Sequence, residues 1–196
     1  MCSTKLQVFA AGVCVLLLTV ANMSCTPYDF SSPSPGEIKI QLKTISSPDH
    51  IPFLPLNNFG LTVSILEGVE TNGNRVPIYS DIQAIKRNPI DYNTLDYRAR
   101  DSDLVIGAGY APPGDYLGID ITAVPDSQVV LNGYQVVGVT TPYNYNPNLR
   151  ILYPFKVEES KLTTITLTVD LDQSLVKGFV TYHFTPYYYI SRVTVQ

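Results

Sequence analysis

Cys25 is the residue whose position most clearly predicts chemistry in this chain of 196 residues. It is the last of three cysteines, and it directly follows an apolar N-terminal run. A lone cysteine at that junction predicts covalent attachment of a lipid to its sulfur, which would tether the chain to a membrane. The alternative is ordinary cleavage near Ala21, which would leave a reactive free thiol in an oxidising compartment. We favour lipidation for that reason.

The segment before this cysteine has the parts of an export signal. Lys5 provides a short positive region, and a mostly apolar run follows over residues 8–21. That run is shorter than the ~20 apolar residues that a membrane-spanning helix needs. Bacterial lipoprotein signals resemble it in having a small residue, here Ser24, before the cysteine, but they usually place Leu where this chain has Asn22. We expect residues 1–24 to be a lipoprotein signal peptide.

Residues that could perform catalysis or bind a metal are few. His50 lies in an expected loop and His183 in an expected strand, and no Gly-x-Ser-x-Gly motif or metal-binding His pair accompanies them. Two carboxylate pairs have a spacing that could ligate calcium, although capping of the following turn is the favoured interpretation. They are Asp101 with Asp103 and Asp170 with Asp172. We therefore predict no catalytic residue, no metal and no cofactor, and we expect that the protein is not an enzyme.

Tyrosine is frequent in this chain, with 14 Tyr and no Trp. Tyrosine offers a rigid contact face with a hydrogen-bonding tip at low entropic cost, although it is also a good strand former. Because successive side chains of a strand alternate between faces, at least one of residues 187–189 should be exposed. The candidate binding surface consists of two segments near turns or a strand end, with Tyr143, Tyr145, Tyr187, Tyr188 and Tyr189.

The charge of the chain says which partners to exclude. The formal net charge of −4 argues against a nucleic-acid partner. There is no run of Lys or Arg that would hold the chain on an anionic lipid surface, so attachment to a membrane would depend on the lipid at Cys25. No cysteine follows Cys25, so the rest of the chain can form no internal disulfide and must be stabilised by its core.

After residue 36 the sequence alternates with a period of two, which is the period of a β-strand. The clearest case is 37–45, where Ile38, Ile40 and Leu42 alternate with polar residues. Asn72-Gly73 and Asn132-Gly133 predict hairpin turns because both residue types tolerate a positive φ. Helical evidence is confined to 80–87 and 89–100, and neither segment has a sustained apolar stripe. Strands are predicted over 37–45, 61–65, 75–82, 117–122, 128–131, 134–139, 151–157, 162–171 and 179–195.

Short strands separated by Gly and Pro turns predict an all-β fold. We expect an antiparallel two-sheet β-sandwich of about seven to nine strands with minimal helix. Residues 25–36 are rich in Pro and Ser, which predicts an extended tether. Residues 37–196 are long enough to bury a core of their own, so they are expected to form a single domain.

Three segments in the C-terminal half carry a resemblance to a known family. They are Ala-Pro-Pro-Gly-Asp-Tyr-Leu-Gly-Ile-Asp-Ile at 111–121, Ile-Thr-Leu-Thr-Val-Asp-Leu-Asp-Gln-Ser-Leu-Val at 165–176, and Tyr-His-Phe-Thr-Pro-Tyr-Tyr-Tyr-Ile at 182–190. With these motifs the chain resembles an uncharacterised prealbumin-like β-sandwich domain of bacterial and archaeal lipoproteins, a domain of unknown function, over about Glu37 to Val195. The chain departs from the family pattern at 141–147. The resemblance implies a prealbumin or immunoglobulin type of fold and an envelope location, and it implies no activity.

These observations predict a non-catalytic, membrane-anchored extracytoplasmic lipoprotein whose β-sandwich binds a protein, a glycan or an envelope component. The alternative is a structural or assembly module of a surface appendage or envelope complex, which would pair through exposed strand edges. A periplasmic enzyme is the third and least supported class. Thr26 lacks the acidic side chain that often retains lipoproteins at the inner membrane. We therefore expect the outer membrane, on its periplasmic face or at the cell surface.

Overall fold

The computed structural model of the protein describes residues 32–78 and 90–196. The predicted signal peptide, Cys25 and most of the predicted tether lie outside the described residues, as does the helical candidate at 80–87. Pro33–Gln196 form one compact unit, which is the β-rich domain described below. Within the described ranges, no helix is long and apolar enough to cross a membrane.

The first sheet has four strands in the order β13-β10-β1-β5. These strands are β1 (Gly36–Ile45), β5 (Leu104–Ala111), β10 (Leu162–Asp170) and β13 (Tyr188–Val195). β1 runs parallel to β10 and antiparallel to β5, and β10 is antiparallel to β13. The predicted alternation of β1 is confirmed, because Ile38, Ile40 and Leu42 are buried and the residues between them are more exposed.

The second sheet has five strands, with β3-β2-β6-β9 in order and β4 paired to β2. They are β2 (Gly60–Glu70), β3 (Arg75–Pro77), β4 (Ile90–Asn93), β6 (Gly114–Pro125) and β9 (Asn148–Val157). All of its pairings are antiparallel. The predicted turn between β2 and β3 is present, but only Gly73 has a positive φ, at 89°. Asn72 instead accepts a hydrogen bond from the backbone N–H of Asn74 at 2.7 Å, as Asn often does in turns.

The first and second sheets share one hydrophobic core. Leu66 of β2 reaches across to β5, since a Cβ added to Gly107 would lie 2.5 Å from its Cδ2. Tyr116 of β6 is 1% exposed and stacks on Phe155, with ring centroids 5.1 Å apart. Inward side chains alternate with outward ones along each sheet, as in other packed sheets. The predicted all-β sandwich is confirmed.

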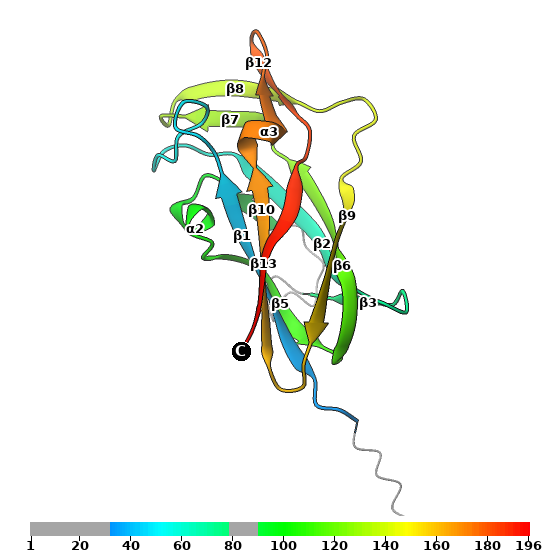
Figure 1. The fold of residues 1–196 in the computed structure, drawn as a ribbon. Helices are drawn as coiled ribbons and strands as arrows, with labels where there is room; N and C mark the ends of the chain where they lie inside the picture. The colour runs from blue at the N-terminus through cyan, green and yellow to red at the C-terminus, as the bar shows by residue number, and fades with distance from the viewer. Residues whose placement is uncertain (1–31, 79–89) are drawn as a thin grey trace, which may run out of the picture. The chain divides into compact units, whose positions relative to one another are not determined.

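A third sheet, in the order β11-β12-β8-β7, lies at one end of the domain (Figure 1). Its strands are β7 (Gln128–Leu131), β8 (Gln135–Thr140), β11 (Leu175–Lys177) and β12 (Thr181–Phe184). β7 and β8 form the hairpin predicted from Asn132-Gly133, and these two residues have φ of 52° and 77°. Val129, Tyr182 and Phe184 are buried and join the common core. Local turn chemistry therefore specified this hairpin correctly.

Several elements differ in detail from the sequence prediction. Residues 89–100 hold β4 and only one short helix, α2 (Tyr97–Arg100), and a second short helix is α3 (Leu171–Ser174). β5 was not predicted, because Gly107 and Gly109 interrupt its alternation. The predicted strand 179–195 is divided into β12 and β13 around Pro186, which cannot donate to a ladder. Parallel pairing of β1 with β10 and of β8 with β12 makes the sandwich mixed rather than purely antiparallel.

Candidate functional site

Tyr143 and Tyr145, from the first predicted tyrosine segment, have different environments. Tyr143 is fully exposed in the loop between β8 and β9. Tyr145 packs on the core, its ring lies edge-on to Phe184, and its hydroxyl donates a hydrogen bond to the carbonyl oxygen of Ala123 at 2.7 Å. Burial raises the pKa of Tyr145 to about 12. The structure therefore leaves Tyr143 accessible and uses Tyr145 for packing.

The second tyrosine segment alternates as predicted. Tyr188 packs against the core, and its buried hydroxyl has no hydrogen-bond partner among the described residues. Burial, with a smaller effect of Tyr145, raises the pKa of Tyr188 well above its ordinary value. Tyr187 and Tyr189 are both exposed and contact each other, with ring centroids 6.0 Å apart and ring planes at 67°. They form a paired aromatic surface at one end of β13.

The register of the first sheet places basic side chains on the same outer face as this pair. On β10, Thr166 and Thr168 point to that face yet are only 7% and 0% exposed, because longer side chains flank them on β1 and β13. The hydroxyl of Thr168 donates to Ser191 Oγ at 2.7 Å. Three rows cross β1, β10 and β13 in this order: Lys43, Thr168, Tyr189; Gln41, Thr166, Arg192; and Lys39, Thr164, Thr194.

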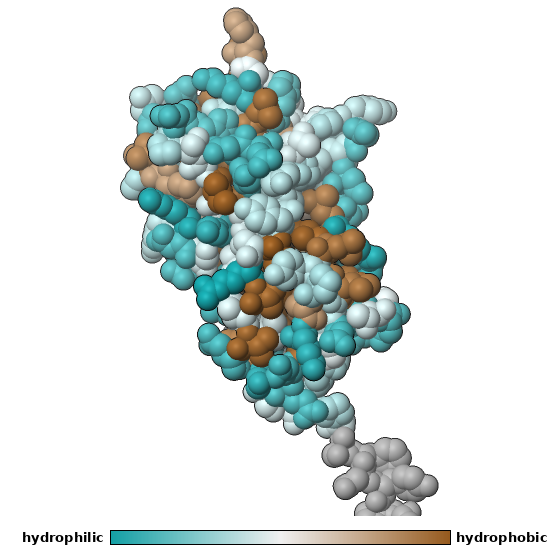
Figure 2. Space-filling view, viewed as in Figure 1, coloured by the Kyte–Doolittle hydropathy of each residue, from teal (hydrophilic) through white to brown (hydrophobic). Residues whose placement is uncertain are grey.

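We call Lys39, Lys43, Arg192, Tyr187 and Tyr189 the cationic face. None of its three basic groups lies within 4.0 Å of a carboxylate oxygen in the described part of the chain. Because no ion pair within the described part of the chain occupies these basic groups, they can donate hydrogen bonds to an anionic ligand. Figure 2 views the domain from the same side as Figure 1, with β13 in front.

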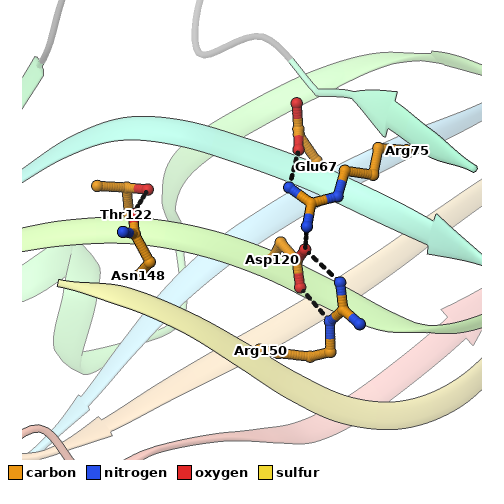
Figure 3. Close-up of polar contacts among 6 residues, drawn as sticks. All are labelled: Glu67, Arg75, Asp120, Thr122, Asn148 and Arg150. Atoms are coloured by element: carbon orange, nitrogen blue, oxygen red, sulfur yellow. Dashed lines mark hydrogen bonds and ion pairs between the residues drawn. The ribbon is translucent and has the colours of Figure 1, made fainter. Parts of the chain in front are cut away.

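Four charged side chains of the second sheet pair with one another (Figure 3). Asp120 of β6 accepts two hydrogen bonds from Arg150, at 2.7 and 2.8 Å, and lies 3.2 Å from Arg75. Arg75 also lies 3.5 Å from Glu67. The hydrogen bonds from Arg150 lower the pKa of Asp120 despite the opposing effect of its partial burial. These charges already satisfy one another, so this group offers less to a charged ligand than the cationic face does.

The residues of the two predicted carboxylate pairs have different roles. Asp170 caps α3 by accepting hydrogen bonds from the backbone N–H and the side-chain amide of Gln173, at 3.2 and 2.9 Å. Asp172 accepts from the backbone N–H of Ser47 at 2.9 Å. Asp101 is the C-cap residue of α2. The capping interpretation is confirmed for Asp170, and no group of three or more metal-binding side chains occurs among the described residues.

The two histidines lie in separate environments. His183 is on β12, as predicted, and its Nδ1 lies 2.7 Å from the hydroxyl oxygen of Thr140. His50 packs edge-on against Tyr182, and its buried Nε2 has no partner among the described residues. Neither contact joins a histidine to a carboxylate, as a hydrolytic triad would require.

Sequence reasoning missed a pair of adjoining grooves around Phe53 and Arg100. Their volumes are about 410 and 340 Å³, and Phe53 and Arg100 line both. The Arg100 guanidinium lies 5.8 Å from the centre of the Phe53 ring, in cation–π contact. The apolar run Ile51–Pro55 was the one available signal, but nothing in its pattern indicated that α2 would lie beside it.

Comparison with known proteins adds no relative. The sequence matches no family model, and no curated protein or solved structure is significantly similar to it. The resemblance to the prealbumin-like lipoprotein domain therefore stays a prediction.

Proposed function

We propose that the protein is a non-catalytic lipoprotein, attached through Cys25 to the outer membrane, that binds an anionic glycan of the cell envelope. The observation that carries the binding part is the cationic face. There, the exposed Tyr187–Tyr189 pair lies beside basic groups that have no carboxylate within ion-pair distance among the described residues.

The chemistry of this face suits an acidic sugar polymer. Tyrosine rings present flat apolar surfaces on which sugar rings can pack, and their hydroxyls can hydrogen-bond to sugar hydroxyls. Lys43 and Arg192 lie in the row of Tyr189 and in the row next to it, so they can meet carboxylate or phosphate groups on the same polymer. Because the side chains stand on paired strands, little backbone entropy is lost on binding.

Affinity electrophoresis tests the proposal with the chain from Thr26 onward, which contains the whole compact unit Pro33–Gln196. We expect retardation in gels containing polygalacturonate and none in gels containing neutral dextran. Tyr189→Ala and Arg192→Glu should each abolish most of the retardation. Tyr110→Ala is the matched control, because Tyr110 is also exposed on the outer face of the first sheet but on the opposite edge strand, β5. No retardation of the unmodified chain, or an equal loss with Tyr110→Ala, would contradict the proposal.

Assembly through strand edges is the second candidate. Among the described strands, β13 and β9 each pair on one side only, at the ends of their sheets. Leu152 and Tyr153 of β9 and Val195 of β13 are exposed, and Figure 2 shows apolar side chains gathered beside β9. Pro154 on β9 opposes strand addition, since it cannot donate a hydrogen bond to a ladder. A clean monomer at high concentration in size-exclusion chromatography would exclude this candidate, and a dimer lost in Leu152→Glu would support it.

A further inference from the structure

We infer that the end of the domain formed by the third sheet docks on a lipid bilayer, through a contact separate from the predicted anchor and from the cationic face. We call this surface the apolar end. It consists of six exposed side chains on the third sheet and the loops that leave it: Tyr134, Val136, Tyr143, Val176, Phe179 and Val180.

The hairpin between β11 and β12 is the most prominent part of the apolar end. Phe179 is 102% exposed and Val180 is 73% exposed at its turn. The turn is closed by a hydrogen bond from the backbone N–H of Gly178 to the carbonyl oxygen of Thr181, at 2.7 Å. Figure 1 shows this hairpin projecting from the end of the domain opposite to the one where β1 begins, and Figure 2 shows an apolar tip there. The turn therefore holds the Phe179 ring in water, which is unfavourable for an apolar side chain. Burial of the ring against a partner surface would be favourable.

Two tyrosines continue the surface on the neighbouring segments. Tyr134 follows the Asn132-Gly133 turn of the β7–β8 hairpin, and Tyr143 lies in the loop that leaves β8. Both are almost fully exposed. An aromatic ring with a polar tip is the side chain that membrane proteins concentrate at the level of the lipid headgroups.

Charge is nearly absent from these segments. Residues 127–149 contain no Asp, Glu, Lys or Arg, although such residues make up 15% of the chain. Between residues 175 and 185 the one formal charge is the positive Lys177. A carboxylate here would be repelled by anionic headgroups and would be costly to bring near hydrocarbon, whereas a single lysine can reach a phosphate. The composition of the apolar end therefore suits a lipid surface.

The shape of the surface favours lipid over a folded partner. Its most exposed side chains stand on separate turns, and the grooves around Phe53 and Arg100 and between Arg75 and Asn148 are lined by other residues. Projecting turns need no complementary pocket when the partner is a fluid interface. Contact with lipid would bury Phe179 and Val180 while the tyrosine hydroxyls and Lys177 stay hydrated.

Vesicle flotation tests the inference with the chain from Thr26 onward, which carries no lipid of its own. We expect it to float with vesicles of phosphatidylcholine, whose headgroups carry no net charge that would attract the cationic face, and we expect Phe179→Asp to lower the bound fraction about tenfold or more. Leu152→Asp is the control, because Leu152 is 70% exposed on β9, outside the apolar end, and this variant should float like the parent. Failure of the parent chain to float, or equal loss in both variants, would overturn the inference.

Fluorescence provides a second measurement, since the chain has no tryptophan. Phe179→Trp should show a blue shift of its emission when the same vesicles are added, and Leu152→Trp should not. An unshifted Phe179→Trp spectrum would overturn the inference even if the chain floats, because another surface would then hold the lipid. Tyr189→Ala should leave flotation unchanged. The flotation experiment therefore tests the lipid contact independently of the glycan proposal.

Discussion

The buried tyrosines Tyr116 and Tyr188 differ in whether the hydroxyl group has a hydrogen-bond partner. The Tyr116 ring is buried and its hydroxyl donates to the carbonyl oxygen of Pro112 at 2.9 Å. The Tyr188 hydroxyl is also buried, but it has no hydrogen-bond partner among the described residues. A buried polar group without a partner has lost its hydration and gained nothing in exchange, so the two hydroxyls should contribute to stability with opposite sign.

Replacing each tyrosine by phenylalanine tests this difference. Tyr188→Phe should raise the free energy of unfolding by about 1 kcal/mol, and Tyr116→Phe should lower it by about the same amount. Chemical denaturation followed by circular dichroism measures both. If Tyr188→Phe proves as destabilising as Tyr116→Phe, then the Tyr188 hydroxyl has a partner in solution.

Asp120 makes stability depend on pH. Its pKa is lowered by the hydrogen bonds from Arg150, and the charges of Arg150 and Arg75 act in the same direction. A carboxyl whose pKa is lower in the folded chain stabilises the fold above its unfolded pKa, and that contribution is lost as the pH falls through the folded pKa. Asp120→Asn should therefore lower the melting temperature at neutral pH and should leave it nearly unchanged in strong acid. An equal loss at both pH values would mean that packing, and not charge, is responsible.

At the scale of elements, β6 holds the second sheet together because it pairs with both β2 and β9. Its register with β9 shifts between Tyr116 and Gly118. Gly118 lies so close to β9 that an added Cβ would be 2.1 Å from the carbonyl oxygen of Ile151. The backbone of β9 cannot move aside as a flexible side chain could. The close approach of β6 and β9 therefore requires glycine at position 118.

Gly118→Ala should lower the free energy of unfolding by about 2 kcal/mol or more, because the strands must separate to admit the methyl group. Gly138→Ala on β8 is a suitable control, since its added Cβ would meet Thr181 Cγ2 at an ordinary 3.5 Å. The pair should be compared by urea denaturation. Similar stability of the two variants would show that the β6–β9 approach is looser than the structure has it.

At the scale of the whole molecule, the described surface is divided by charge. On the second sheet Glu67, Arg75, Asp120 and Arg150 pair with one another. The first sheet carries basic groups without carboxylate partners within ion-pair distance in the described part of the chain, and the third sheet is nearly uncharged. A chain of net charge −4 can therefore attract an anion at one face while repelling it elsewhere. The lipid attachment proposed for Cys25 would keep this domain at the envelope.

Mass spectrometry of the mature N-terminus tests the anchor. We expect a diacylglyceryl-modified Cys25 as the first residue, and we expect Cys25→Ala to move the protein out of the lipid-anchored fraction. An unmodified terminus near Ala21 or Asn22 would show ordinary cleavage instead. Persistence of the Cys25→Ala chain in membranes that have been washed free of peripheral proteins would also contradict lipid anchoring.

The sequence alone determined the features that depend on neighbouring residues. The period of two predicted β1 and most of the other strands, Asn132-Gly133 predicted its hairpin, and residues 187–189 predicted their own alternation. These follow from local backbone geometry, which a short stretch of chain encodes by itself. The prediction failed locally at β5, where Gly107 is set by the approach of Leu66 from the other sheet.

Tertiary structure alone decided which strands meet. No local pattern indicates that β1 pairs in parallel with β10, more than 100 residues later in the chain, because parallel pairing depends on long-range packing rather than on a turn. That pairing places Lys43 and Tyr189 on either side of Thr168. It was likewise the fold that buried Tyr145, gave Asp120 its two arginines and left Phe179 in solvent. The sequence named the side chains that could bind, and only the assembled sheets determined which of them share a face.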